Sequence, residues 1–157
     1  WDAVARLPEK LRVPIHLYYA EGYSTEEIAG LLQARCERLT DIPEKVDFFD
    51  ALPDYDVNLF ANKKSKSTLD SSREMLSAAI GMLANLPSWS EAMIHDSLVG
   101  LAEGLGVKNA LLMWPVRIAA AGKSVTPGGA VEICHILGRE ETVRRLKLGL
   151  DKLSSFS

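Results

Sequence analysis

The sequence predicts an all-α protein, a multi-helix bundle of roughly nine helices, and three observations support this fold class. No segment alternates apolar and polar residues as a half-buried strand would. Many segments instead place apolar residues three or four positions apart, as Leu76, Ile80 and Leu83 are. Ser, Thr or Asp stands at the expected start of several such segments, and Gly stands at the expected end of others.

Two helices are expected at the start of the chain. The first begins at Pro8 and ends at Gly22, and the second begins after Ser24 and continues to about Leu39. Ser24 and Glu27 have the spacing of a capping box, in which each side chain accepts a hydrogen bond from the other residue's backbone N–H. The second helix therefore has a defined start.

The same signals continue along the rest of the chain. Helices are expected from 42 to about 50, at 108–121 and at 127–137. The apolar positions of four further helices fall within 57–60, 69–83, 94–105 and 143–153. Asp56 and Thr68 are expected to cap two of them, and Ser88 with Glu91 has the spacing of a second capping box. Pro115 is expected to kink the helix that contains it.

Composition limits the function classes. The 157 residues are 47% apolar and carry a formal net charge of −3, whereas a typical nucleic-acid-binding domain is basic. Any contact with RNA must therefore come from local basic patches. Cys36 and Cys134 are far apart in sequence, which favours reduced thiols in a cytoplasmic protein. No apolar run has the length of a membrane span, no secretory signal is evident, and the start at Trp1 leads us to expect a fragment.

Residues 112–129 (LMWPVRIAAAGKSVTPGG) combine the end of one helix, a short loop and the start of another. Thr126 suits the N-cap of the second helix, and Pro127 suits its first position, where a missing N–H loses no bond. Gly128 and Gly129 would leave the first-turn N–H groups uncovered, and such groups bind anions or base edges.

Two basic residues accompany this turn. Arg117 lies on the preceding helix and Lys123 lies in the loop. Together with the uncovered N–H groups they make a candidate binding site. The alternative is an ordinary corner between two helices with the usual caps.

The stretch WPVRIAAAGKSVTPGGAVEICHILGREETVRRLKLGLDKL resembles the end of a bacterial glutamyl-tRNA synthetase, within its C-terminal anticodon-binding region. The resemblance extends upstream to about Leu31, through LLQARCERLTDIPEKVDFFDALPDYDVNLFANKKSKS and WSEAMIHDSLVGLAEGLGVKNALLMWPVR. It covers roughly four fifths of the chain, and the quoted stretches together make it specific. It implies an all-helical anticodon-binding domain over 34–157, appended to a class I aminoacyl-tRNA synthetase.

The resemblance also implies a site and partners. It places anticodon contacts at the helix and turn that hold Trp114, Arg117 and Thr126. Many relatives carry a large apolar residue where Gly129 stands, so only backbone contact is expected at this position. The implied partners are the anticodon stem-loop of tRNA-Glu and the catalytic domain of the parent synthetase. No catalysis is expected from this chain alone, and ATP and Mg would belong to the parent rather than to this chain.

Residues 1–33 show a different resemblance. The stretch LPEKLRVPIHLYYAEGYSTEEIAGLL is similar to region 4 of a bacterial sigma factor, in which an aromatic-rich helix leads into a DNA-binding helix-turn-helix. After Gln33 the chain lacks the expected recognition helix and becomes synthetase-like. We therefore expect 1–33 to be a sigma-like fragment joined to the synthetase-like part within one continuous helix from about Thr25 to Leu39. The junction would be an artefact, an engineered chimera or a gene fusion.

Three functions follow from these resemblances. The first is a tRNA-binding module that supports glutamylation of tRNA-Glu in the cytoplasm. The second is a transcription module that binds promoter DNA through 1–33, and the missing recognition helix argues against it. The third is a structural chimera that binds nothing.

Lys63, Lys64 and Lys66 form a basic cluster in the segment NKKSKS. The segment is similar in sequence to the ATP-binding KMSKS loop of class I synthetases, but that loop works only beside a nucleotide-binding parallel sheet, which the sequence does not predict. The lysines fit either a solvated loop or contacts with the tRNA backbone, since clustered lysine attracts phosphate without recognising sequence.

No catalytic or metal site is expected. The histidines have no metal-ligand spacing, and no Ser-His-Asp or Cys-His set is evident. Glu140 and Glu141 are expected in the first turn of a helix, where the helix dipole favours them. The basic cluster on the last helices is expected to be mainly a solvated face, and its members are Arg139, Arg144, Arg145 and Lys147.

Overall fold

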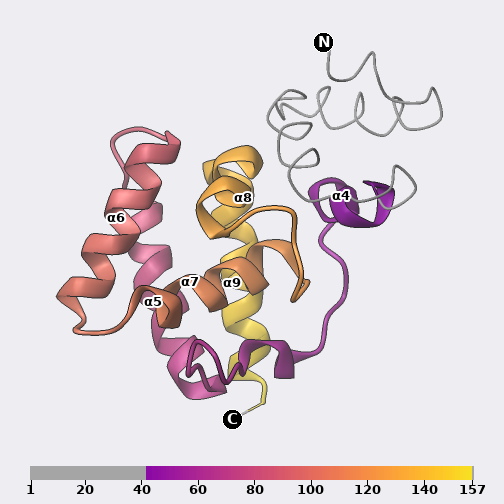
Figure 1. Ribbon diagram of the computed structural model, residues 1–157, viewed down its shortest axis with the longest axis horizontal. Helices are drawn as coiled ribbons and strands as arrows, with labels where there is room; N and C mark the ends of the chain where they lie inside the picture. Colours follow the sequence, from indigo (N-terminus) through magenta and orange to yellow (C-terminus); the bar gives the residue numbers. More distant parts are fainter. Residues whose placement is uncertain (1–41, 157) are drawn as a thin grey trace.

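The computed structural model describes residues 42–156, and this part of the chain is all-α, as predicted (Figure 1). Its elements are α4 (Ile42–Asp50), the 3-10 helix η2 (Val57–Phe60), α5 (Leu69–Leu83), α6 (Glu91–Gly104), α7 (Asn109–Ala121), α8 (Ala130–Leu137) and α9 (Arg139–Ser154). Within 42–156 the one extended pairing is an isolated antiparallel bridge between Asn62 and Ser67. The helices expected at 8–22 and 25–39 lie outside the described residues, and the division at residue 33 stays a prediction.

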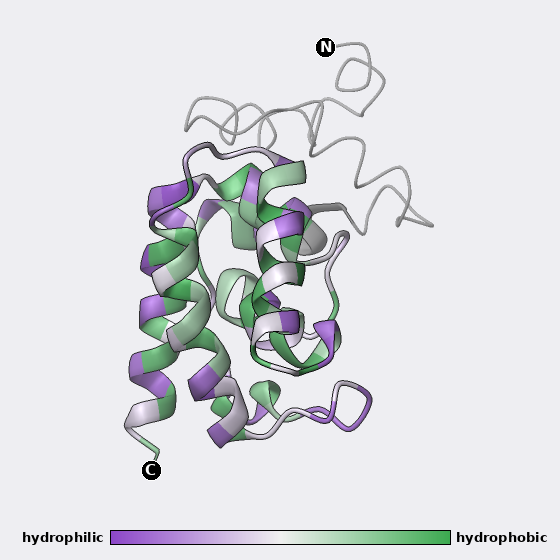
Figure 2. Ribbon diagram, turned by 90° about the vertical axis from the view of Figure 1, so that its left-hand side faces the viewer, coloured by the Kyte–Doolittle hydropathy of each residue, from purple (hydrophilic) through white to green (hydrophobic). Residues whose placement is uncertain are grey.

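Helix α7 lies at the centre of the bundle. It packs against α5, α6, α8 and α9, and α5 also packs directly against α9 (Figure 1). The apolar positions of the helices face one another and the hydrophilic positions face outward (Figure 2). The centre is closed by fully buried side chains, among them those of Phe60, Leu76, Leu83, Ile94, Leu98, Leu112, Ile118 and Leu146.

Local capping chemistry explains several helix starts. The Asp56 carboxylate accepts a hydrogen bond from the Asn58 N–H at 2.8 Å, which confirms the predicted cap of η2. Thr68 caps α5 as predicted, in a reciprocal box with Ser71. The predicted box of Ser88 with Glu91 is wrong, because Ser90 caps α6 instead and accepts from the Met93 N–H at 3.2 Å. Ser90 directly precedes the first helical residue, so its hydroxyl reaches the N–H three positions on.

Helices α7 and α9 pack tightly against each other at Gly149. A Cβ atom added there would lie 2.9 Å from Ala119 Cβ and 3.3 Å from the ring of Phe60. Such a separation is shorter than packed carbon atoms tolerate. The missing side chain of Gly149 therefore sets the spacing between the central helix and α9.

None of the helices within 42–156 has the length and apolar character that a membrane crossing requires.

Candidate nucleic-acid interface

Helix α7 places Trp114 and Arg117 on one face, because residues three apart on a helix are neighbours. The guanidinium carbon of Arg117 lies 4.7 Å from the centroid of the Trp114 ring, a cation–π arrangement. The Trp114 Nε1–H donates to the carbonyl oxygen of Leu59 at 2.9 Å, which fixes the indole against η2. The pair therefore forms a rigid platform on the surface of α7.

The Arg117 guanidinium is also tied to the turn that follows α7. It donates to the Ser124 carbonyl at 2.8 Å and to the Thr126 hydroxyl at 3.3 Å. Partial burial lowers the pKa of Arg117 below its ordinary value, and an arginine still keeps its charge at neutral pH. No carboxylate of residues 42–156 lies within ion-pair distance of it. The charge is therefore held in place without being neutralised by the described part of the chain.

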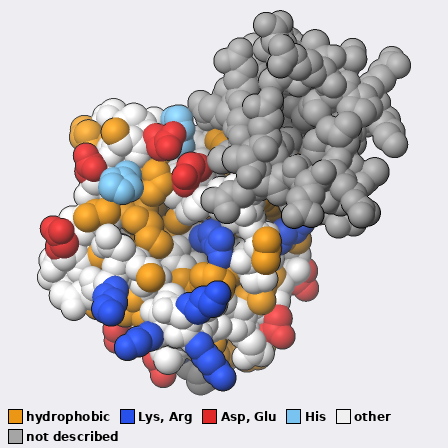
Figure 3. Space-filling view, viewed as in Figure 1, with side chains coloured by type: hydrophobic (Ala, Val, Ile, Leu, Met, Phe, Trp, Pro, Cys, Tyr) orange, Lys and Arg blue, Asp and Glu red, His pale blue; other side chains and the backbone are white. Residues whose placement is uncertain are grey.

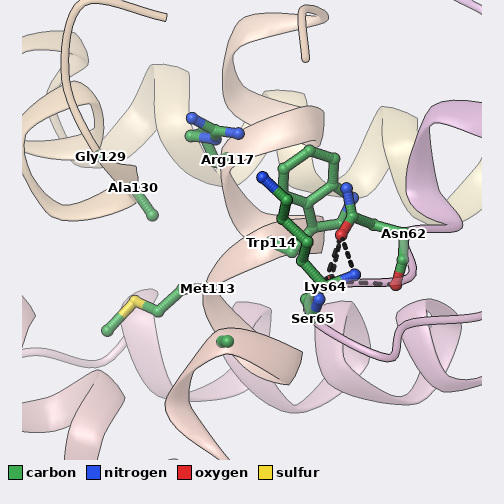
Figure 4. Close-up of a pocket in the computed structure, with 9 residues that line it drawn as sticks. Asn62, Lys64, Ser65, Met113, Trp114, Arg117, Gly129 and Ala130 are labelled. Atoms are coloured by element: carbon green, nitrogen blue, oxygen red, sulfur yellow. Dashed lines mark hydrogen bonds between the residues drawn. The ribbon is translucent and has the colours of Figure 1, made fainter. Parts of the chain in front are cut away.

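A surface hollow of about 350 Å³ opens beside this platform. Figure 4 shows the loop residues on one side, the start of α8 on the other, and Trp114 and Arg117 between them. Apolar atoms dominate its lining, with a few polar groups, a composition typical of ligand-binding sites. The residues that line it are Asn62, Lys64, Ser65, Ala110, Met113, Trp114, Arg117, Gly129 and Ala130.

Residues 62–67, here called the lysine loop, lie on one side of the hollow. They form a tight turn closed by backbone hydrogen bonds. Asn62 and Ser67 exchange two backbone hydrogen bonds of 3.0 Å, and the Asn62 side-chain oxygen accepts from the Lys64 and Ser65 N–H groups. Lys66 has a φ of +59°, a left-handed conformation that is uncommon for a residue with a side chain. Lys63, Lys64 and Lys66 are exposed. The turn therefore projects three ammonium groups from a well-defined backbone.

The turn between α7 and α8 differs from the prediction. Helix α8 begins at Ala130 with Gly129 at the N-cap, so Thr126 is not the cap and Pro127 is not the first helical residue. The Thr126 hydroxyl instead donates to the Gly128 carbonyl at 2.6 Å and accepts from Arg117, and these bonds hold the segment in a separate turn. The predicted cap is therefore wrong, because the Thr126 side chain bonds with Arg117 of the preceding helix and with Gly128 instead of with the first turn of α8.

The start of α8 also differs from the anion-binding site that the sequence predicts. Gly128 is buried, as is the neighbouring Pro127, so the expectation of an uncovered N–H group is wrong for Gly128. A Cβ added at Gly129 would lie 3.0 Å from a carboxylate oxygen of Glu132. An acidic side chain therefore lies beside the first turn of α8, where it is favoured by the helix dipole and disfavours a second anion.

The structure brings together only some of the predicted site residues. Lys64, Trp114, Arg117 and Gly129 line the hollow. The Lys123 ammonium forms an ion pair with the Asp47 carboxylate of α4, so its predicted contact with RNA stays a prediction.

The prediction missed other lining residues, among them Asn62, Ala110 and Met113. A signal for the two on α7 was present, since 110, 113 and 117 are spaced three and four apart and so share a helix face. Asn62 comes from a segment about fifty residues away in sequence, and local pattern alone does not bring it to this face.

Lys and Arg side chains gather on the lower half of the molecule in the view of Figure 3, while the histidines lie in its upper part and acidic side chains lie both there and along the lower edges. Among the basic residues of the described region, Lys64 of the lysine loop and Arg117 line the same hollow. This uneven distribution provides the local basic patch that an overall acidic chain needs to contact RNA.

The basic cluster of α9 is only partly a solvated face. The Arg144 side chain is 56% exposed and makes two hydrogen bonds to Glu141, at 2.7 and 2.8 Å. Together with Arg145, and against the opposing effect of burial, these bonds lower the pKa of Glu141 to about 2. The prediction is wrong for Arg145, which is fully buried. Its burial depends on partners from two other elements, which the spacing within α9 does not show.

The metal-ligating residue types do not gather in the described region. His135 Nδ1 lies 3.9 Å from Glu91, and His95 Nδ1 lies 3.1 Å from Asp96. Residues 42–156 hold no group of three His, Cys, Asp or Glu side chains suited to a metal ion. Cys134 is a free, buried thiol, and burial raises its pKa to about 12.

The comparisons with known proteins agree with this architecture. A family model described as "Anticodon binding domain" matches residues 7–150, so the chain belongs to the anticodon-binding domain family. The match includes most of residues 1–33, so it gives no support to the sigma factor interpretation. Curated relatives are glutamate–tRNA ligases: the Clostridium tetani enzyme is 44% identical over 151 residues, and the Clostridium acetobutylicum enzyme is 41% identical over 143 residues.

These alignments cover 93% and 87% of this chain and 30% of each relative, so the chain spans about three tenths of the length of the curated relatives it matches. The fold is also similar to solved structures. A glutamate–tRNA ligase from Elizabethkingia meningosepticum has a TM-score of 0.68 at 21% identity, covering 89% of this chain and 28% of that chain. The enzyme from Elizabethkingia anophelis has a TM-score of 0.64 at 21% identity, with 91% and 28% coverage. The described part of the chain is therefore all-helical, and its fold is similar to part of these glutamate–tRNA ligases.

Proposed function

We propose that this chain is the tRNA-binding module of a cytoplasmic glutamate–tRNA ligase, and that the hollow beside α7 receives the anticodon loop of tRNA-Glu. The observation that carries the proposal is the stacked pair of Trp114 and Arg117, which lies between an apolar hollow and an exposed lysine loop. Unpaired bases of RNA loops are recognised by stacking and by hydrogen bonds to their edges. An indole, a guanidinium and an apolar wall supply both kinds of contact.

The proposed site has two parts. The platform and the hollow contact bases, because a planar guanidinium donates in a fork and also stacks. The lysine loop contacts phosphates, because ammonium groups attract the backbone without recognising the base. The adenylation of glutamate, with its ATP and Mg, would then belong to the catalytic domain of the longer enzyme.

Titration of the 157-residue chain tests the proposal. The probes are tRNA-Glu, the same tRNA with a substituted anticodon, and a duplex that carries a promoter −35 element. We expect tRNA-Glu to bind most tightly and the substituted anticodon to weaken binding. Equal affinity for the two tRNAs would contradict anticodon recognition, and preferential binding of the duplex would support the transcription alternative.

A change in the lysine loop should weaken binding without changing sequence preference. We expect Lys63→Ala to lower the affinity for both tRNAs by the same factor and to reduce the slope of log affinity against log salt by about 0.7 to 0.9. The reason is the loss of one phosphate contact with its released counterion. The measurement is a titration of both tRNAs at several salt concentrations.

Two further variants make this test sharper. Lys66→Asn removes another positive charge of the lysine loop. Its backbone is left-handed, a conformation that Asn tolerates better than most residues. Lys147→Ala removes an exposed charge from α9, away from the lining of the hollow, and should leave the slope unchanged. An equal slope change in the Lys147 variant would show that the loop has no special role.

A further inference from the structure

The buried side chain of Arg145 joins three helices. Its Nη1 donates to the Phe48 carbonyl of α4 at 2.5 Å and to the Ala120 carbonyl of α7 at 2.8 Å. Its Nε donates to Glu141 of α9 at 2.6 Å. The residue is 0% exposed, and its Nη2 has no hydrogen-bond partner within the described region.

The two carbonyls share a position in their helices. Phe48 lies in the last turn of α4 (Ile42–Asp50), and Ala120 lies in the last turn of α7 (Asn109–Ala121). The last carbonyls of a helix have no partner within it and carry the negative end of the helix dipole. One guanidinium therefore caps the C-terminal ends of two helices at once, and holds these ends at a defined separation.

The same end of α7 carries the candidate interface. Ala120 is three residues after Arg117 and two before Gly122, whose φ of +67° ends the helix and begins the turn. The side chain of Pro53, in the segment after α4, packs against Gly122, since an added Cβ would lie 2.9 Å from its ring. The Arg145 hydrogen bonds and this contact hold the end of α7 on two sides.

A second tie connects α4 with the turn. The ion pair of Lys123 and Asp47 joins the first residue after Gly122 to α4. Both residues are partly accessible at the surface, whereas Arg145 lies in the core. Salt screens exposed pairs and affects buried ones much less. Arg145 is therefore the connection that persists at high ionic strength.

We propose that Arg145 is a positioning residue for the anticodon-binding turn, acting by capping α4 and α7 together. The inference rests on the proposed function, because the turn matters only where Arg117 and its neighbours contact RNA. Arg145 touches no ligand itself. It fixes the direction in which α7 ends, and with it the positions of Arg117 and the turn at 122–129.

The test compares Arg145→Met with Arg144→Met. Methionine fills similar space without donors, and Glu141 keeps one arginine partner in each variant. Hydrogen exchange of the free protein is the first measurement. We expect amides of 118–130 to exchange at least about tenfold faster in Arg145→Met, with α6 unchanged, because a lost tertiary contact acts on the local opening unit.

Binding is the second measurement. The ratio of affinities for tRNA-Glu and for the tRNA with a substituted anticodon should fall about fivefold or more in Arg145→Met. The salt slope should stay at the wild-type value, because no phosphate contact is lost. A residue that only stabilised the fold would not change the ratio of affinities in a folded variant. Arg144→Met should retain both the exchange pattern and the ratio.

The outcomes separate this inference from the proposed function. Wild-type exchange at 118–130 in folded Arg145→Met overturns the positioning role, whatever the wild type binds. Equal binding of both tRNAs by the wild type overturns the proposed function, and the exchange result then still decides whether Arg145 holds the turn. If Arg145→Met does not fold, Arg145→Lys replaces it. A single ammonium lacks the guanidinium fork, so protection of the turn should fall in this variant too, and wild-type protection would overturn the role.

Discussion

Arg117→Ala lowers the affinity for tRNA-Glu at least about tenfold, and the loss is much smaller for the tRNA with a substituted anticodon. A fork of hydrogen bonds from arginine to a base edge provides about 1–3 kcal/mol of discrimination, which is the energy removed here. Burial and the contacts with Trp114, Ser124 and Thr126 hold the guanidinium in one orientation before RNA arrives. The entropy of ordering the side chain on binding is therefore small.

Two variants distinguish a direct contact from support of the turn. Arg117→Lys keeps the charge but loses the planar fork, so it should lose discrimination while keeping most of the salt dependence. Thr126→Val removes one internal partner of Arg117 and leaves the guanidinium in place, so it should cost less than Arg117→Ala. Both proteins are titrated with both tRNAs at two salt concentrations. If Arg117→Ala binds each tRNA as tightly as wild type does, Arg117 is a structural residue.

Gly149→Val lowers the free energy of unfolding by about 3 kcal/mol, because overpacking a close helix crossing forces the backbones apart. The added carbon atoms would overlap with Ala119, Tyr55 and Phe60, which lie in the centre of the bundle. A domain of this size should lose roughly 6–12 °C in Tm, measured by thermal and denaturant unfolding.

Gly100→Ala is the matched control. Gly100 is also a helical glycine, but it is exposed and nothing lies within 4 Å of the position of its Cβ. Alanine should therefore stabilise the chain by roughly 0.5–1 kcal/mol through helix propensity. Similar unfolding energies for wild type and Gly149→Val would show that α7 and α9 have room to separate.

Helix positions were predictable where the signal is local. The caps at Asp56 and Thr68 depend on bonds to residues two or three positions away, and both were predicted. The start of α8 was not, because the Thr126 hydroxyl bonds with Arg117 from the preceding helix. A residue pattern shows which side chain is able to cap a helix. Which group this side chain actually bonds with depends on the tertiary fold.

The candidate site was likewise predictable only where its residues lie close together in the sequence. Trp114 and Arg117 lie on one helix, and the resemblance to synthetases selected this helix and its turn. The buried state of Arg145 could not be inferred from its spacing, because it depends on carbonyls contributed by α4 and α7. Packing of distant segments decides which charges are available to a ligand, and sequence pattern says little about such packing.

The uneven placement of charge also affects how a nucleic acid approaches the protein. The whole chain carries a formal charge of −3, although Lys64 and Arg117 line one hollow and Lys63 and Lys66 flank Lys64 in the same exposed loop. A polyanion is repelled by the average field of the molecule and attracted only near this basic face. Collisions in other orientations then separate quickly, and the encounters that persist are those in which the RNA already faces α7.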